Sequence, residues 1–497
     1  MQIFLAGVVA FTYLAIAGSK IERYPKYDLL GIGLIKRMAK SRTFRLAVQM
    51  IVVAAFIFTL AAGFIGAQAL DNINVVITWS WWYMLLFILA LLVGRFWCFA
   101  CPWKSIVDWI LNRSFLKVRK ERDVMGLHRP WPKKLRGIHI PLIFFSVLFL
   151  FDLAFIYGWK FIPIATSLLG VFFLIFTFLG LFFFSRGSFC RYACIVGWVQ
   201  GSFTNLSPLE LRARDKKICA EECKNKDCLN GNDSGYGCPT YQLLQVMDNN
   251  SQCLLCTECV KTCPYDNVSI NIRPYGMDLV TSKRFGMNDA YFAIILLALS
   301  LFHRISMSPS WLEFGDTLNL PGLPGSGHVL AFIIGVSVSV SITYGGHYAF
   351  SSLSLKLSGN NNVNFRSVFS NYAYAFLPFP FLYLAGHCFE HLFSMGAEII
   401  PAISDPFGWG WNLFGTAAVQ PLPLFGTLAL KWIITLFIII SVIACIWVAF
   451  QRSRIVFDDD REAFRSLIPI VVWIYVLTIV GIWFVAQPMI WVPYPVE

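Results

Sequence analysis

The sequence predicts an all-α polytopic membrane protein, with about ten transmembrane helices and one small inserted domain that is polar and cysteine-rich. Three observations support this fold class. The 497-residue chain is 57% hydrophobic and only 14% charged, with 46 Phe and 17 Trp. Many of its apolar stretches reach the roughly 20 residues that a helix needs to cross a bilayer. Most of its cysteines fall within one polar segment in the middle of the chain.

Ten apolar stretches are long enough to be membrane spans, and they divide evenly on either side of the polar segment. We expect an N-terminal membrane domain of five helices at 1–185, a ferredoxin-like domain at 186–286 and a C-terminal membrane domain of five helices at 287–497. The expected spans are 2–18, 46–66, 78–97, 138–158, 161–185, 287–304, 328–346, 369–393, 430–450 and 466–487.

The distribution of Lys and Arg predicts the orientation of these spans. The loops Lys20–Arg45 and Lys104–Arg136 carry eight and ten basic residues, whereas the alternate loops 67–77, 305–327 and 394–429 carry none. This is the positive-inside pattern, with both termini outside and the polar domain in the cytoplasm of a multi-pass cytoplasmic-membrane protein. It also explains the net charge of +12 without a nucleic-acid partner. We interpret the loop Lys20–Arg45 as a solvated segment beside anionic lipid headgroups.

The segment from Cys253 to Pro264 has the spacing CxxCxxCxxxCP. This spacing is typical of two-cluster ferredoxins, in which three thiolates hold one [4Fe–4S] cube and the fourth reaches a second cube. We therefore assign one cluster to Cys219, Cys223, Cys228 and Cys263, and the other to Cys253, Cys256, Cys259 and Cys238. A zinc site or a disulfide framework is the alternative, but neither places four cysteines so close together before a proline. A reducing cytoplasm would keep these ligands as thiols, in agreement with the charge distribution.

Two further cysteine pairs lie at the inner ends of predicted spans, each close to a Gly–Arg or Arg–Gly step. They are Cys98 with Cys101, followed by Pro102, and Cys190 with Cys194. Three interpretations remain open for these four residues. They hold a third [4Fe–4S] cluster, they form a redox-active dithiol system, or they are packing residues without a ligand.

Taken together, these motifs resemble the membrane-bound polyferredoxins, namely the NapH-type, NosR-type and CcoG-type proteins. The resemblance covers residues 46–275 and implies electron transfer between quinone and a partner protein. Two departures stand out: the first pair is one residue shorter than the CxxxCP of this family, and Ile195 replaces the proline after the second pair. The last five spans have no counterpart in the core of the family.

Five of the seven histidines lie in the C-terminal membrane domain. His387 and His391 share a helix face because they are four residues apart, and Glu390 is adjacent. One hypothesis is a b-type haem held by His387 or His391 with His328, and another is a quinone site where His387 and Glu390 exchange protons. The alternative is that these histidines bond nearby carbonyls or headgroups.

The function that we expect is a membrane-integral electron-transfer subunit. It would relay electrons through two or three [4Fe–4S] clusters between the quinone pool, or a cytoplasmic donor, and another redox subunit of a larger complex. Two alternatives are a redox maturation factor for a respiratory metalloenzyme, with Cys98 and Cys101 as its dithiol, and an ion-translocating redox subunit. The polar domain has no nucleotide-binding glycine motif, so a soluble donor would bring its own cofactor.

Overall fold

The computed structural model describes residues 12, 21, 24–69, 71–119, 123–154, 163–283, 285–321 and 326–488, with backbone only for 148–154. The fold is mostly helical, and seven of its described helices are long and apolar enough to cross a membrane. Six of these run unbroken: α3 (Arg42–Ile65), α10 (Pro163–Phe183), α16 (Met287–Ile305), α18 (Ser326–Ser358), α22 (Thr427–Val456) and α23 (Asp460–Ala486). The seventh joins α4 (Ile73–Val75), the π-helix η2 (Val76–Trp82) and α5 (Tyr83–Val93).

Each of these seven helices overlaps one of the ten predicted spans. Of the other three, the predicted span 2–18 lies outside the described residues. The predicted span 138–158 is represented by α8 (His139–Ala154), which runs up to an undescribed segment. The predicted span 369–393 is broken into α19 (Phe365–Ala375) and α20 (Pro378–Met395). Pro378 explains this break, because proline lacks an amide hydrogen and therefore starts a helix more readily than it continues one.

The N-terminal helices form one bundle. Helices α3, α7 (Pro102–Asn112) and α10 pack against one another, and the short α6 (Phe96–Ala100) connects α5 to α7. Stacked and edge-on aromatic rings fill the contact between α8 and α10, as Phe144 does against Phe172 and Phe173. Further along the chain, α11 (Ser188–Tyr192) and α12 (Ile195–Phe203) lead from this bundle into the polar domain.

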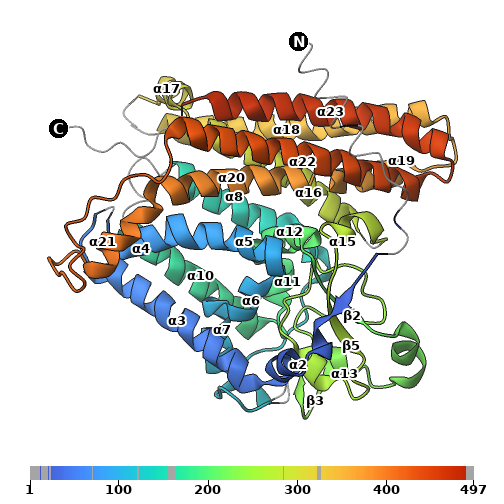
Figure 1. Cartoon of the computed structure of the whole chain (residues 1–497), viewed down its shortest axis with the longest axis horizontal. Coiled ribbons are helices and arrows are strands. Elements are labelled where there is room, and N and C mark those ends of the chain that lie inside the picture. Colours follow the sequence, from blue (N-terminus) through green and yellow to red (C-terminus); the bar gives the residue numbers. More distant parts are fainter. Residues whose placement is uncertain are drawn as a thin grey trace.

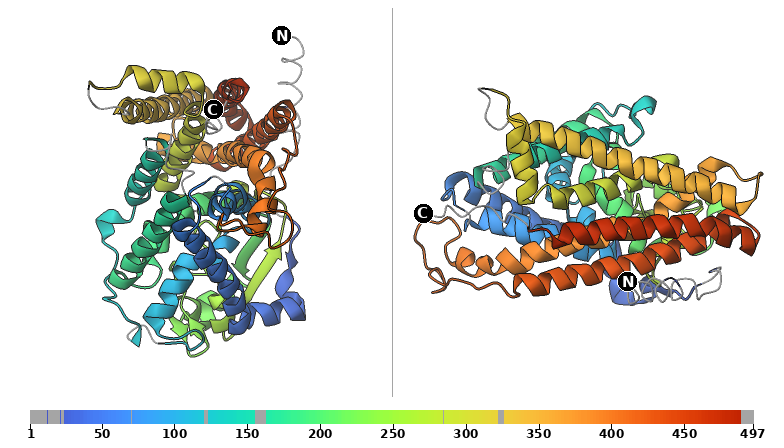
Figure 2. Two further views of the ribbon diagram at one scale, coloured as in Figure 1. Left: turned by 90° about the vertical axis from the view of Figure 1, so that its left-hand side faces the viewer. Right: turned by 90° about the horizontal axis from the view of Figure 1, so that it is seen from above.

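The C-terminal helices form a second bundle beside the first (Figure 1). Helix α23 packs against α18 and α22, while α16 and α20 contact both this bundle and the N-terminal one. Figure 2 shows the long helices of both bundles running in roughly the same direction. The short helices α17 (Pro309–Thr317) and α21 (Ile399–Ser404) lie at the end of the bundles away from the polar domain (Figure 1).

The cysteine-rich domain lies at one end of the bundles and contains short strands as well as helices (Figure 1). Its sheet is antiparallel, with strand order β1–β5–β2, where β1 is Tyr27–Asp28, β2 is Leu209–Ala213 and β5 is Val268–Ile272. A hairpin pairs β3 (Gly231–Asn232) with β4 (Gly235–Tyr236). Four short helices complete the domain: η6 (Ile218–Glu222), α13 (Asp227–Asn230), α14 (Glu258–Thr262) and α15 (Met277–Thr281).

Part of the loop Lys20–Arg45, which we interpret as a solvated segment beside lipid headgroups, also packs on this domain, although none of the residues of its helix is buried. Strand β1 (Tyr27–Asp28) pairs with β5 and extends the sheet. Helix α2 (Gly33–Lys40) then lies beside α14, and its Lys36 and Lys40 both form ion pairs with Asp266. These two basic side chains therefore contact the domain through one carboxylate, that of Asp266.

Candidate functional site: three groups of cysteines

The first group brings together the four cysteines of the first predicted cluster. After burial, Cys263 and Cys223 raise the pKa of the Cys219 thiol, and Cys219, Cys223 and Cys263 raise that of the Cys228 thiol, so the four lie close together. Asn267 contacts two sulfurs of this group. Its backbone N–H donates to Cys263 Sγ and its side-chain Nδ2 to Cys219 Sγ, both at 3.3 Å.

The second group brings together the four cysteines of the other predicted cluster. The thiol of Cys259 interacts with those of Cys253, Cys256 and Cys238, and the thiol of Cys238 also accepts a hydrogen bond from the Gln242 N–H at 3.3 Å. The loop that carries these cysteines is tightly curved, because Leu255 and Thr257 adopt left-handed backbone conformations with φ of 52° and 59°. Such conformations cost about 1–3 kcal/mol each and concentrate at functional sites.

The third group brings together the cysteines of the two helix-end pairs. After burial, Cys98, Cys194 and Cys190 raise the pKa of the Cys101 thiol, so the four lie close together. Both pairs are arranged alike: the first cysteine lies on a short helix, α6 or α11, and the second is the N-cap of the next helix, α7 or α12. Pro102 is the first residue of α7, where its missing amide hydrogen costs nothing. Two segments nearly a hundred residues apart thus meet at one point.

Burial raises the pKa of thiols in all three groups. The pKa rises to about 11 for Cys190 and Cys228 and to about 12 for Cys194 and Cys253, chiefly because an apolar surrounding disfavours the thiolate. Without a metal these thiols are neutral at pH 7. A bound metal would instead favour the thiolate, so binding would release protons.

Each group offers the donor set that a [4Fe–4S] cube requires, which is four cysteine sulfurs. A cube presents one iron to each thiolate, so its ligands surround a volume rather than one point. Among the described residues, no three His, Cys, Asp or Glu side chains are disposed as the ligands of a single metal ion. The backbone and side-chain N–H groups directed at sulfur in the first two groups are the kind of contact that tunes cluster potentials.

A buried carboxylate, Glu258, fixes the second group to the membrane domain. It lies between Cys256 and Cys259, and its oxygens accept from Arg42 at 3.2 Å and from Arg45 and Lys261 at 3.0 Å. Burial alone would raise the pKa of Glu258, but these three cations outweigh it and the pKa is lowered. Because Arg42 and Arg45 open helix α3, this cluster of charges joins a predicted membrane span directly to the cysteine loop.

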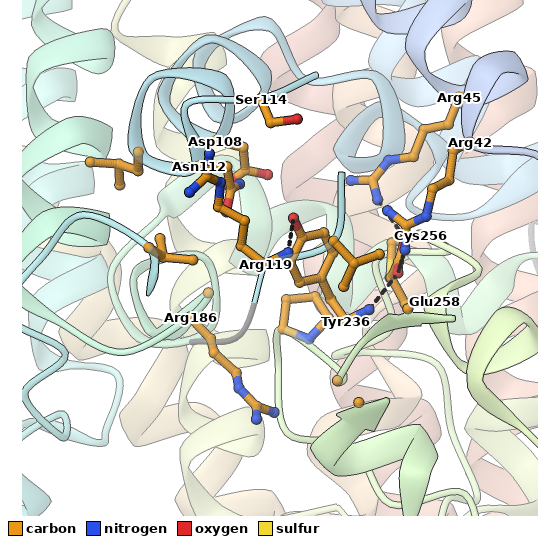
Figure 3. Close-up of a pocket in the computed structure, with 18 of the residues that line it drawn as sticks. Arg42, Arg45, Asp108, Asn112, Ser114, Arg119, Arg186, Tyr236, Cys256 and Glu258 are labelled. Atoms are coloured by element: carbon orange, nitrogen blue, oxygen red, sulfur yellow. Dashed lines mark hydrogen bonds and ion pairs between the residues drawn. The ribbon is translucent and has the colours of Figure 1, made fainter. Parts of the chain in front are cut away.

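A cavity of about 490 Å³ lies between the second and third groups, with Cys256 and Cys98 both on its wall. Figure 3 shows Arg42, Arg45 and Glu258 on one side of it, and Arg119 beside Tyr236 nearby. Six basic side chains line it against three acidic ones; the basic ones are Arg42, Arg45, Lys104, Lys117, Arg119 and Arg186. Its size falls within the roughly 300–1,000 Å³ of ligand pockets, and its charge favours anions.

Arginines from the helix-end motifs hold the polar domain against the bundle. Arg186 donates to the carbonyls of Leu229 and Asn230, and Arg191 donates to that of Thr240 at 2.6 Å. Close packing accompanies these bonds, since a Cβ added to Gly187 would lie 2.9 Å from the Cβ of Pro239, the residue after Cys238. The second and third groups are thereby kept in a fixed relation.

A second buried network supports the loop that precedes Cys253. Arg273 contacts Glu210 at 2.9 Å and Asp278 at 2.6 Å, and Arg212 contacts Asp278 at 2.5 Å. The other oxygen of Asp278 accepts from the N–H of Asn250 at 2.9 Å. Strands β2 and β5, helix α15 and the cysteine loop therefore share one charged core.

The structure groups the C-terminal histidines differently from the predicted set. Nε2 of His387 lies 3.0 Å from that of His303 and 3.2 Å from that of His391. Beside them, Arg304 and Glu390 form a buried ion pair at 2.5 Å. His328, the predicted partner of His387, has its Nε2 3.1 Å from Asp316. The histidine from a separate helix that the structure brings to His387 and His391 is thus His303 of α16.

Three residues that matter to these sites were not singled out from the sequence: Glu258, Arg95 and His303. Glu258 lies inside the cysteine motif, and Arg95 directly follows Gly94 in the first helix-end motif. Their positions in the sequence could therefore have drawn attention to them, although a glutamate or an arginine alone does not predict a site. Comparison of the chain with protein-family models, curated proteins and solved structures finds no match.

Proposed function

We propose that this chain is a membrane-integral electron-transfer subunit that binds two [4Fe–4S] clusters in its polar domain. The observation that carries this proposal is the sorting of eight cysteines into two groups of four, in the pairing that ferredoxin spacing requires. When bound, the clusters supply one-electron redox chemistry. The protein positions them and sets their potentials through burial, charge and hydrogen bonds to sulfur.

The order of the groups supports a relay. Cys259 of the second group interacts with Cys228 of the first, so these two groups are neighbours. The second group in turn shares a cavity wall with Cys98 of the third. The three groups therefore form a series from the polar domain to the helix ends that carry Cys98 and Cys190. Electrons transferred along this series would pass between a soluble or membrane-bound partner and the membrane bundle.

The location that we propose is the cytoplasmic membrane, with the polar domain on the cytoplasmic side. The positive-inside distribution of Lys and Arg supports this orientation, as does the need for reduced thiols. The proposed protein partners are other redox subunits of a membrane complex. The proposed lipid-soluble electron carrier is quinone or quinol. This agrees with the resemblance to the membrane-bound polyferredoxins.

Reduction of the purified, anaerobic protein tests this function. We expect broad visible absorption that bleaches on reduction and recovers when an acceptor is added. Cys256→Ala should remove part of this signal, whereas Cys445→Ala should leave it unchanged, because Cys445 is buried in α22, among the apolar side chains of the C-terminal bundle. A wild-type protein without a bleachable chromophore would contradict the proposal.

A second candidate function is the coupling of electron flow to ion or proton movement through the C-terminal bundle. The contact of His303, His387 and His391 beside the Arg304–Glu390 pair favours it, because ionisable side chains at membrane depth are costly and often functional. Proton uptake by vesicles containing the purified complex during electron transfer tests it. Loss of uptake in Glu390→Gln, with electron transfer retained, is the expected result, and unchanged uptake would contradict it.

A further inference from the structure

Arg95 is a fully buried arginine whose charge is not neutralised by any described residue. Only 1% of its surface is exposed. Its Nη1 donates to the carbonyl of Ser251 at 2.8 Å, two residues before Cys253. In the part of the chain that the structure describes, its Nε and Nη2 have no hydrogen-bond partner and no carboxylate forms an ion pair with it.

Such a side chain calls for a nearby anion. Arginine stays protonated in proteins, so Arg95 cannot become neutral as a buried lysine or histidine can. A buried charge without a partner costs several kcal/mol. The fold nevertheless keeps Arg95 in place, and the residue before it, Gly94, has a φ of 67° that few other residues adopt.

The guanidinium of Arg95 lies in a groove of helix α12, next to the third group of cysteines. Two glycines one turn apart make the groove: a Cβ added to Gly197 would lie 2.8 Å from Arg95 Nη2, and one added to Gly201 would lie 3.4 Å from Nη1. The same added Cβ on Gly197 would lie 3.6 Å from the Cβ of Cys194. Arg95 accordingly interacts electrostatically with both Cys190 and Cys194.

The other charges acting on these thiols do not supply the anion. Lys104 and Asp108 also face Cys190, but they neutralise each other through an ion pair at 2.5 Å. The N-termini of α7 and α12 add further positive potential, since Cys101 and Cys194 are the N-caps of these helices and Cys194 Sγ accepts a hydrogen bond from the Gly197 N–H at 3.4 Å. Arg95 and the N-terminus of α12 are thus the features beside the third group that favour negative charge within it.

We propose that Cys98, Cys101, Cys190 and Cys194 hold a third [4Fe–4S] cluster, and that Arg95 is the counter-charge that positions and tunes it. Four thiolates outweigh the positive charge of the cube's core, so the ligated cluster is an anion. The two alternatives, a disulfide pair or four unliganded thiols, are neutral and would leave Arg95 uncompensated. The inference extends the proposed relay: one electron lost by the second cluster reduces the third by one electron.

Iron and acid-labile sulfide analysis of the anaerobic full-length protein tests the cluster. Three cubes predict about twelve irons per chain. The double variant Cys98→Ala/Cys190→Ala should retain about eight, with the EPR signals of the other two clusters unchanged. About eight irons in the wild-type protein would overturn this inference but leave the proposed function intact, whereas no iron would overturn both.

Arg95→Gln tests the role of the counter-charge in a redox titration followed by EPR. Loss of a positive charge beside the cluster disfavours its reduction, so one midpoint potential should shift to a more negative value and Arg95→Lys should partly restore it. Arg452→Gln is the matched control, because Arg452 is equally buried but packs against Phe285 and Tyr374. Equal potentials in wild-type protein and Arg95→Gln would refute this role. If Arg95→Gln does not accumulate, the midpoint potential of Arg95→Lys tests the counter-charge, and the iron content of the wild-type protein tests the third cluster.

Discussion

Glu258 is the residue that links the cysteine loop to the membrane domain most directly. Its carboxylate is 3% exposed and lies among Arg42, Arg45 and Lys261. Removing one partner from a buried ionic cluster leaves the other charges uncompensated, which typically costs about 3–5 kcal/mol. The conformational cost of the two left-handed residues in the cysteine loop is thus offset by the ionic contacts of the Glu258 carboxylate.

We predict that Glu258→Gln lowers the free energy of unfolding by about 3 kcal/mol. Fluorescence-detected thermal unfolding of the anaerobic protein in detergent measures this change. Asp233→Asn, in the exposed turn of the β3–β4 hairpin, is the control and should unfold like the wild-type protein. Equal unfolding temperatures for all three proteins would show that the cations around Glu258 do not depend on its charge.

The ion pair between Arg304 and Glu390 is a buried charged contact within the helical bundle, as Glu258 with its cations is in the polar domain. We predict that Glu390→Gln destabilises the protein by about 3 kcal/mol, because Arg304 loses a carboxylate at 2.5 Å. The double variant Arg304→Gln/Glu390→Gln should recover much of this loss, since neither charge then remains. A double-mutant cycle of unfolding free energies measures the coupling, and simple additivity of the two changes would contradict the prediction.

At the scale of elements, the helix-end motifs determine how the polar domain meets the bundle. We predict that Gly187→Ala displaces the loop carrying Cys238, because the new Cβ would lie 2.9 Å from Pro239. EPR should then show a weakened or altered signal from the second cluster. Gly345→Ala, on α18 with open space around it, is the control and should match the wild-type spectrum. An unaltered spectrum in Gly187→Ala would mean that this contact is not needed.

Features that depend on local spacing could be predicted at this scale. Seven helices follow from runs of apolar residues. The cysteine intervals around Cys253–Cys263 predict which cysteines share a cluster, because a short loop reaches only a nearby partner, and this assignment stays a prediction. Tertiary contacts could not be predicted in the same way. Tyr27–Asp28 pairs with β5, which is more than two hundred residues away in the sequence. His303 of α16 contacts His387 of α20, a separate helix. The break before Pro378 was hidden by the apolar residues on both sides of it.

At the scale of the whole molecule, the bundle ends differ in charge. The loop between α18 and α19, the turn between α22 and α23 and the polar domain lie at one end (Figure 1), and Arg452 of α22 donates to the carbonyl of Ser282 there at 2.8 Å. The segment between α21 and α22 lies at the other end and contains no Lys or Arg. A membrane would therefore separate a face rich in Lys and Arg from one whose α21–α22 segment has neither.

We predict that reporter fusions after Asn360 and after Asp459 report the cytoplasm, and that a fusion after Gly410 reports the outer side. The reason is the positive-inside rule applied to the two ends of the bundle. A pair of reporters, one active only inside and one only outside, measures each position. The opposite pattern would place the cysteine-rich domain outside, where its thiols would oxidise.

The central claim is that eight cysteines between residues 219 and 263 hold two iron–sulfur cubes. Its most direct measurement is the EPR spectrum of the anaerobically purified, reduced protein, quantified against its iron content. We predict spectra of interacting [4Fe–4S] clusters and at least about eight irons per chain, with Cys228→Ala and Cys259→Ala each losing signal from a different cluster. A colourless protein with no iron and no EPR signal would contradict this account.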